Sequence, residues 1–269
     1  MTVYFEARTN SGVLQVRDDT AISYMSSKSK LSSYYVTSQS CKYQLEGGSN
    51  TSHTMYIYSL PTNINVYIGN PSSTAVHIFM TINNVTDFSN NKALGLRKLV
   101  GVSNCTKAQA DNLDVYMFKQ DAVGGTGAVG LQCYNASGVK VFDSNSNYLK
   151  VLDVVNFQHC AYGNWYNIEH SSSWTKIDRT HNHSGRSIAY WCSMFGTGGQ
   201  WNRNTSGDNN WWVHDHYSEV CVLSASSARV ATLKHTEFPV GGSVNYNFCL
   251  LHGATCNRTM YSIIDVTNY

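Results

Sequence analysis

The sequence predicts an all-β protein made of two tandem β-sandwich-like domains with few short helices. The first observation is composition: charged residues make up only 13% of the 269 residues, about half the usual share of roughly 25%. Ser, Thr, Asn, Gly and Tyr take their place, and these residues suit strand surfaces and turns better than the outer faces of helices. The second and third observations are a hairpin pattern that occurs twice and a glycine-rich segment before its second copy.

The hairpin pattern occurs near the start of the chain and again in its middle. Residues 5–16 and 131–143 each consist of two β-favouring arms joined by a small polar turn that ends in Ser-Gly. Glycine supplies the positive φ that a tight turn needs. Any two hairpins can look alike, so the pattern alone leaves a chance similarity open.

The position of the second hairpin favours a true repeat. It follows residues 121–130, the most glycine-rich stretch of the sequence, and such a stretch is typical of a linker because it is flexible and hard to bury. We therefore predict a boundary near residue 128. An N-terminal β domain spans 1–128, and a C-terminal β domain with Trp/His-rich loops spans 129–269.

Other elements follow from local patterns. Alternation of apolar and polar residues is typical of half-buried strands, and it predicts strands over 34–37, 54–58, 66–69, 75–80, 148–155, 218–223, 246–251 and 261–266. Two short helices are expected over 106–112, with Thr106 as a candidate N-cap, and over 224–233, although neither has a clear amphipathic stripe.

Several classes of protein are disfavoured. The net charge is +2 with no dense Lys/Arg block, so we expect no nucleic-acid partner. The first residues do not resemble a secretory signal, and no apolar run reaches the roughly 20 residues of a membrane-spanning helix, so we expect no membrane insertion. The eight cysteines are scattered without a CxxC pair. We expect a protein made in a cytosol, with reduced cysteines that have structural roles.

A tryptophan-rich window holds the candidate binding residues. All six tryptophans lie between residues 165 and 212, and the window contains a long polar stretch over 196–210 that we predict to be a loop. Aromatic side chains beside Asn, Asp and Arg can stack on sugars or anchor a protein interface, whereas a Trp-rich core is the structural alternative. The candidate interface or receptor-binding residues are Trp201, Arg203, Trp211 and Trp212.

Two His-x-His pairs, His181/His183 and His214/His216, are candidate metal ligands. Residues two apart on a strand share a face, so each pair could offer two imidazoles to one ion. No Cys or Glu stands at a diagnostic spacing, and hydrogen-bonded surface histidines are the alternative. We therefore predict no bound metal and no other cofactor.

Catalytic motifs are not apparent. The sequence has no G-x-S-x-G nucleophile elbow and no phosphate-binding P-loop. A glycan hydrolase would require two carboxylates about 5–10 Å apart in a groove, and no spacing singles out such a pair. We predict that the protein is not an enzyme and assign no catalytic residue.

One segment resembles a known family. Residues 130–144, followed by Tyr148-Leu149-Lys150-Val151-Leu152-Asp153, resemble the stretch G-L-x-V-x-N-x-x-G-x-x-x-F-D-S … Y-L-x-V-x-D of small tail-associated proteins of tailed phages that infect Gram-negative bacteria. Residues 263–269 also resemble the final strand of such proteins. Cys133 departs from the pattern, since an aliphatic residue is usual there.

The resemblance implies a β-rich virion protein of the tail tip or tail fibre region. We expect a structural component that assembles in the host cytoplasm, forms a homo-oligomer and contacts other phage tail proteins, because low charge and many aromatic residues suit a subunit that buries much of its surface. The alternative is an adhesin module for host attachment, in which the Trp-rich region binds a host surface glycan or an outer-membrane receptor.

Overall fold

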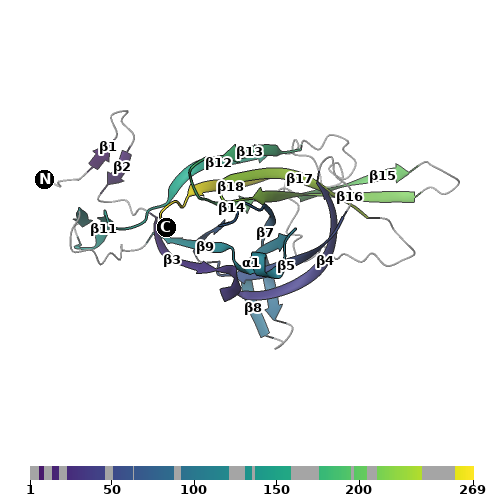
Figure 1. Ribbon diagram of the computed structural model, residues 1–269, viewed down its shortest axis with the longest axis horizontal. Coiled ribbons are helices and arrows are strands. Elements are labelled where there is room, and N and C mark those ends of the chain that lie inside the picture. Colours follow the sequence, from purple (N-terminus) through teal and green to yellow (C-terminus); the bar gives the residue numbers. More distant parts are fainter. Residues whose placement is uncertain are drawn as a thin grey trace.

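The computed structural model describes residues 6–8, 14–17, 23–45, 51–62, 64–87, 92–120, 131–134, 137–158, 176–194, 197–204, 211–237 and 258–269. Strands dominate this part of the chain, and the predicted all-β class is confirmed (Figure 1). The elements, in chain order, are β1 (Glu6–Arg8), β2 (Leu14–Arg17), β3 (Tyr24–Lys30), the 3-10 turn η1 (Leu31–Ser33), β4 (Tyr35–Leu45), β5 (Thr51–Leu60), β6 (Asn65–Gly69), β7 (Val76–Asp87), β8 (Lys92–Ser103), α1 (Lys107–Asp111), β9 (Asp114–Lys119), β10 (Gln132–Tyr134), β11 (Lys140–Asp143), β12 (Lys150–Gln158), β13 (Asp178–Asn182), β14 (Ile188–Met194), β15 (Thr197–Asn204), β16 (Trp211–Leu223), β17 (Ser227–Glu237) and β18 (Arg258–Asp265).

Two large antiparallel sheets form the body of the molecule. One has six strands in the order β12-β18-β14-β6-β9-β3, and the other has eight in the order β13-β17-β4-β5-β8-β7-β16-β15. The larger sheet curls, because β16 also pairs with β17 along most of its length. The two sheets form sandwich-like layers.

Both sheets combine strands from the two halves of the sequence. In the six-stranded sheet β14 pairs with β6, and in the eight-stranded sheet β17 pairs with β4 and β16 pairs with β7. Strands of segments 1–128 and 129–269 are therefore hydrogen-bonded neighbours. The described strands do not separate at residue 128, and the glycine-rich segment over 121–130 lies outside the described residues.

The main core lies between the sheets. It combines apolar side chains of the six-stranded sheet, such as Ile68, Phe118 and Ile263, with side chains of the eight-stranded sheet, such as Tyr58 and Val230, all at most 1% exposed. Burying a large apolar side chain contributes about 1.5–3 kcal/mol. This shared core ties the two sheets together.

A second, smaller core occupies the other face of the eight-stranded sheet. Along β5, Met55 and Ile57 belong to this cluster, whereas Tyr58 and Leu60 belong to the main core. Successive residues of a strand point to opposite faces, so β5 is buried on both sides. This explains why the last four residues of the strand, Ile57 to Leu60, are all buried instead of alternating between buried and exposed.

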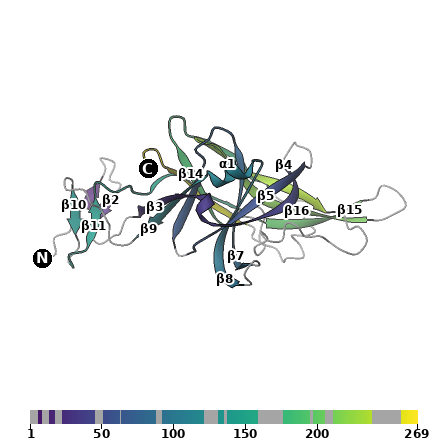
Figure 2. The ribbon, with the colours of Figure 1, turned by 60° about the horizontal axis from the view of Figure 1, so that its bottom comes forward.

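The repeated hairpin pattern yields two matching hairpins. In β1–β2, Ala7 pairs with Val16 and Arg8 pairs with Leu14, so that one residue is skipped. In β10–β11, Cys133 pairs with Phe142 and Tyr134 pairs with Lys140, with a skip at the same place. Both hairpins lie outside the two large sheets at one end of the molecule (Figures 1 and 2).

The turn of the second hairpin needs its glycine. Gly138 has a φ of +75°, a left-handed conformation that costs other L-residues roughly 1–2 kcal/mol. This agrees with the role predicted for the glycine of the Ser-Gly turn. The equivalent turn of the first hairpin lies outside the described residues.

The helix predictions have mixed outcomes. The helix near 106–112 is confirmed as α1, and Thr106 caps it by accepting a hydrogen bond from the backbone N–H of Gln109, whose side chain in turn accepts from the Thr106 N–H. The helix predicted over 224–233 is wrong, because most of that segment belongs to β17. Among the described residues, no helix is long and apolar enough to span a membrane.

The predicted strands are confirmed wherever the structure describes them. Those over 34–37, 54–58, 66–69, 75–80, 148–155, 218–223 and 261–266 correspond to β4, β5, β6, β7, β12, β16 and β18. The strand predicted over 246–251 lies outside the described residues.

Candidate functional site

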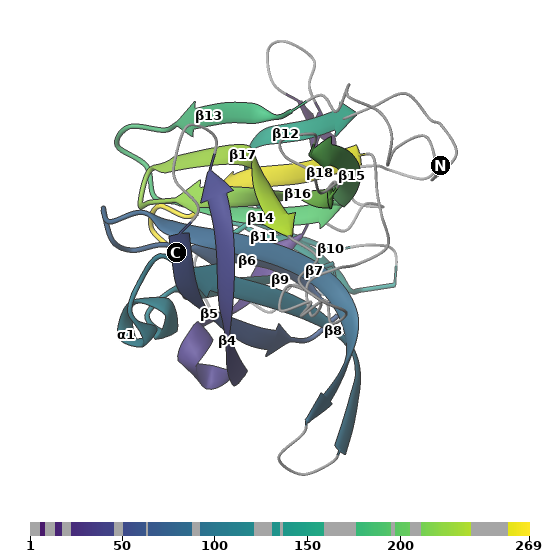
Figure 3. The ribbon, with the colours of Figure 1, turned by 90° about the vertical axis from the view of Figure 1, so that its right-hand side faces the viewer.

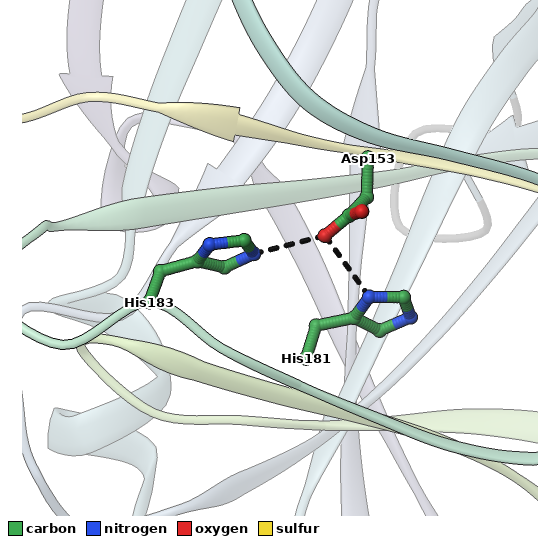
Figure 4. A group of neighbouring side chains, drawn as sticks. All are labelled: Asp153, His181 and His183. Atoms are coloured by element: carbon green, nitrogen blue, oxygen red, sulfur yellow. Dashed lines mark hydrogen bonds and ion pairs between the residues drawn. The ribbon is translucent and has the colours of Figure 1, made fainter.

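Three polar side chains converge where the edges of the two sheets meet. Asp153 lies on β12, the terminal strand of the six-stranded sheet, and His181 lies on β13, the terminal strand of the eight-stranded sheet. His183 follows directly after β13. Strands β12 and β13 run beside each other (Figures 1 and 3). We call these three residues the Asp-His-His cluster (Figure 4).

The local backbone determines where each side chain of the cluster points. The register between β12 and β18 shifts between Val151 and Asp153, and bulges of this kind re-aim a side chain. Beyond the shift, Asp153 shares a face with Val155, which is buried. The shift therefore gives Asp153 the inward-facing register position on an edge strand.

The histidines are fixed by the end of β13. The backbone N–H of His183 donates to the carbonyl of Ser226, and the carbonyl of His183 accepts from Arg186 in a turn that contains Gly185 at a φ of +76°. These two hydrogen bonds fix the backbone of His183 directly after the end of β13. The His-x-His spacing thus directs both imidazoles toward β12.

The cluster is compact. The Oδ2 atom of Asp153 lies 3.0 Å from Nδ1 of His181 and 2.9 Å from Nε2 of His183. The other ring nitrogen of His181, Nε2, lies 2.8 Å from the hydroxyl of Tyr261 on β18. One carboxylate oxygen of Asp153 therefore lies within hydrogen-bonding distance of both imidazoles, and the His181 ring has a polar partner at each of its two nitrogens.

Burial differs across the cluster. The side chains of His181 and His183 are 13% and 19% exposed, whereas that of Asp153 is 35% exposed. Tyr261 is buried beneath them, and this burial raises its pKa well above the ordinary value. The phenol is therefore neutral and acts as a hydrogen-bonding partner for His181 at all moderate pH values.

A further contact links the same two edge strands. The guanidinium of Arg179 on β13 lies 5.6 Å from the ring centroid of Phe157 on β12. The ring of His181 also meets that of Tyr261 edge-on at 5.6 Å. The two sheet edges are thus held together by several polar and aromatic contacts around the cluster.

Sequence reasoning found two members of this cluster and missed the third. His181 and His183 were candidate ligands, and the structure brings them together. Asp153 was missed as a partner because it stands 28 residues before His181 in the sequence, although it ends the Y-L-x-V-x-D stretch. His214 and His216 lie on β16, where the backbone register pairs them with Glu237 and His235; their side chains are outside the described part of the structure.

The candidate interface residues gather on one hairpin. Residues 197–204, predicted as part of a loop, form β15 instead, because they pair with β16 along their whole length. The register places Arg203 opposite Trp212, Asn204 opposite Trp211 and Trp201 opposite His214. Trp201, Arg203, Trp211 and Trp212 therefore come from neighbouring backbone positions on β15–β16, which extends away from the main body (Figures 1 and 2).

The structure describes the side-chain surroundings of one tryptophan of the window, Trp191. Trp191 on β14 is buried in the main core and its ring meets the Lys98 ammonium at 4.8 Å, so the core alternative holds for this residue. Trp165 and Trp174 lie outside the described residues.

Exposed apolar side chains concentrate in one stretch of the chain. Within the described residues, the large hydrophobic side chains that remain exposed all fall between residues 131 and 154. They lie on or next to the β10–β11 hairpin and on β12: Leu131, Tyr134, Val139, Val151 and Val154. We call these five residues the exposed apolar segment.

The connection between the hairpin and β12 is well ordered by hydrogen bonds. The side chain of Asp143 is fully covered and accepts from the Lys140 ammonium, the Gln132 amide and the backbone N–H of Asn145. The Lys140 ammonium, followed by the Asn145 N–H, lowers the pKa of Asp143 to about 2. The ring of Phe142 stacks on that of Tyr148 at 5.1 Å.

The residues that carry the family resemblance therefore build a defined junction. The Phe142-Asp143-Ser144 stretch and Tyr148 make it, since the Tyr148 hydroxyl also donates to the carbonyl of Asp143. Their side chains have structural roles in joining the second hairpin to the six-stranded sheet.

The cysteines fit the predicted reduced state where they are described. Cys41, Cys105, Cys133, Cys192 and Cys221 are free thiols. Burial raises the pKa of Cys41 and that of Cys105 to about 11, so these thiols are inert near neutral pH.

Comparison of the chain with protein-family models, with curated proteins and with solved structures gave no match.

Proposed function

We propose that this protein is a structural component of a phage tail, in the tip or fibre region, and that it acts through protein–protein contacts without catalysis. The exposed apolar segment is the observation that carries the proposal. Four of its five members lie in the stretch that resembles tail-associated proteins, and Val154, directly after that stretch, is 67% exposed. Exposed large apolar side chains that fall within one stretch of the chain indicate a surface that partners cover.

The position of β12 supports a contact of this kind. It is the terminal strand of the six-stranded sheet, and the end strand of a sheet presents backbone N–H and C=O groups that can pair with a strand of another chain. The apolar side chains of Val151 and Val154 would add contact area. A neighbouring tail subunit, including another copy of this chain, is the partner that the proposal assigns to this edge.

The experiment tests incorporation into virions. Val154→Asp introduces a charge into the exposed apolar segment, whereas Ser38→Asp introduces the same charge at an exposed position of β4 and is the matched control. Both changes affect exposed residues, so each should alter the free energy of unfolding by no more than about 0.5 kcal/mol. We expect Val154→Asp to be depleted from purified particles, measured by quantitative mass spectrometry, and Ser38→Asp to be retained.

The outcomes separate the two parts of the proposal. Absence of the unaltered protein from purified particles would refute the virion assignment. Equal incorporation of both variants would refute the exposed apolar segment as the contact surface while leaving the assignment to the virion intact.

The second candidate function is host attachment through the β15–β16 hairpin. The observation that favours it is the backbone register, which gathers the four candidate residues on a hairpin that extends from the body. An adhesin of this kind would lose adsorption to host cells in Trp212→Ala, measured with labelled protein, while Val154→Asp would adsorb normally. Equal adsorption of Trp212→Ala and the unaltered protein would refute the candidate.

A further inference from the structure

We propose that Asp153, His181 and His183 bind one Zn²⁺ ion and that this ion links the edges of the two sheets. The proposal concerns the folded chain itself and does not depend on a role in a virion. It rests on the geometry of the Asp-His-His cluster, in which three ligand atoms of the right chemistry lie within 4.8 Å of one another.

The distances from the carboxylate oxygen to the two imidazole nitrogens are close to those of a zinc site. With metal–ligand bonds of about 2.0–2.1 Å, neighbouring ligands of a tetrahedral site lie about 3.3 Å apart. The carboxylate oxygen of Asp153 is 3.0 Å from the His181 nitrogen and 2.9 Å from the His183 nitrogen. Each of these pairs therefore needs to separate by only a few tenths of an ångström to admit the ion.

Tyr261 holds His181 in an orientation that suits metal binding. Metal-binding histidines usually donate their second ring N–H to an oxygen, which fixes the ring orientation. The Tyr261 hydroxyl occupies that position for His181, 2.8 Å from Nε2, and leaves Nδ1 directed toward Asp153. Tyr261 is itself buried in the core, so the second shell of the site is rigid.

The ligand chemistry favours zinc over the common hard cations. Two imidazole nitrogens and one carboxylate oxygen suit Zn²⁺, whereas Ca²⁺ and Mg²⁺ take mainly oxygen ligands. Because the Asp153 side chain is 35% exposed, solvent reaches the cluster and a water molecule can supply the fourth ligand.

The location of the cluster gives the ion a structural role. Asp153 belongs to the six-stranded sheet and His181 to the eight-stranded sheet. An ion bound between them would replace hydrogen bonds across the two sheet edges with coordinate bonds. Since the ion binds the folded chain preferentially, it would raise the melting temperature.

Titration of the full chain with Zn²⁺ tests the proposal. The chain is first treated with a chelator and dialysed, and binding and thermal melting are then measured with Zn²⁺ and, separately, with Mg²⁺. We expect saturation at one Zn²⁺ per chain with a rise in melting temperature, and no effect of Mg²⁺ at the same concentrations. Asp153→Asn and His183→Gln should each weaken zinc binding by more than about 100-fold, since loss of a second-shell partner alone typically costs 10–100-fold.

Control variants distinguish this site from other histidines. His53→Gln removes an imidazole that is hydrogen-bonded to Thr51. Both residues are far from the cluster in the sequence, and this variant should bind zinc like the unaltered chain. The double variant His214→Gln/His216→Gln removes the other His-x-His pair and should also bind normally. Tyr261→Phe should weaken binding by about 10–100-fold while leaving the visible absorption of bound Co²⁺ unchanged, because the ligand set is intact.

The folding of each metal-free variant is checked by circular dichroism. His183→Gln keeps the proposal testable if Asp153→Asn does not fold, because His183 lies in a turn and is partly exposed. The absence of saturable zinc binding by the unaltered chain would overturn the proposal. So would equal binding by His183→Gln, or loss of binding in the His214/His216 double variant alone.

Discussion

Mild acid should destabilise this protein through one buried histidine. His77 on β7 is 7% exposed, and its Nδ1 atom lies 2.6 Å from the hydroxyl of Tyr43, which is 2.7 Å from the Ser103 hydroxyl. Burial, and then the neighbouring His53, lower the pKa of His77 from 6.5 to about 4. The folded protein therefore holds this imidazole in its neutral form.

The size of the effect follows from the two pKa values. Because the unfolded chain protonates His77 near pH 6.5 and the folded chain only near pH 4, the unfolded state binds more protons between these values. The contribution of the neutral His77 imidazole to folding stability is fully present above pH 6.5, and it is lost as the pH falls toward 4. Between pH 7 and pH 5, this one group should lower the free energy of unfolding by about 2 kcal/mol.

Urea denaturation at pH 7, 6 and 5 measures this loss. His77→Asn is the comparison, since its amide reaches a position similar to Nδ1 and does not titrate in this range. His53, whose pKa burial also lowers, contributes to both proteins. We expect the unaltered chain to lose about 2 kcal/mol more than His77→Asn between pH 7 and 5. An equal loss in both proteins would refute the assignment to His77.

Three further predictions concern local structure and thiol reactivity. A methyl group added in Gly69→Ala would stand 2.8 Å from Cε2 of Tyr116, and we expect a loss of about 1–3 kcal/mol by urea denaturation; an unchanged midpoint would contradict the close contact. Thr106→Ala removes the cap of α1 and should cost about 1 kcal/mol in the same assay, whereas Thr106→Asp should restore most of it. Burial raises the pKa of Cys221 well above that of an ordinary thiol, so timed alkylation read by mass spectrometry should label the half-buried Cys133 first; the reverse order would argue against the described packing.

Local patterns in the sequence were sufficient for much of the secondary structure. The Ser-Gly hairpins, the alternating strands and the Thr106 cap depend on residues close in the chain, so propensity and periodicity reveal them. The error at 224–233 has a similar local cause. Alanine and serine in that segment suggest a helix, but pairing with β16 and burial of Val230 make it a strand, because the tertiary context overrides weak propensity.

Strand partners could not be predicted in the same way. The pairing of Ile68 with Tyr190 joins residues from opposite halves of the sequence, and no local pattern specifies that choice. The same limit applies to the site. His181 and His183 are recognisable as a pair from their spacing, whereas Asp153 joins them only because a bulge in β12 and the meeting of two sheet edges bring it there.

The place of β18 has a consequence for how the chain acquires its structure during synthesis. This strand is the last in chain order among the described ones, yet it lies between β12 and β14 and pairs with both. A ribosome must therefore translate past residue 265 before the six-stranded sheet can form, and until then β12 and β14 lack their common neighbour. Non-local pairing of this kind folds slowly, so the edges of β12 and β14 that pair with β18 stay unpaired during synthesis, and a stop codon before β18 should yield a product that cells degrade.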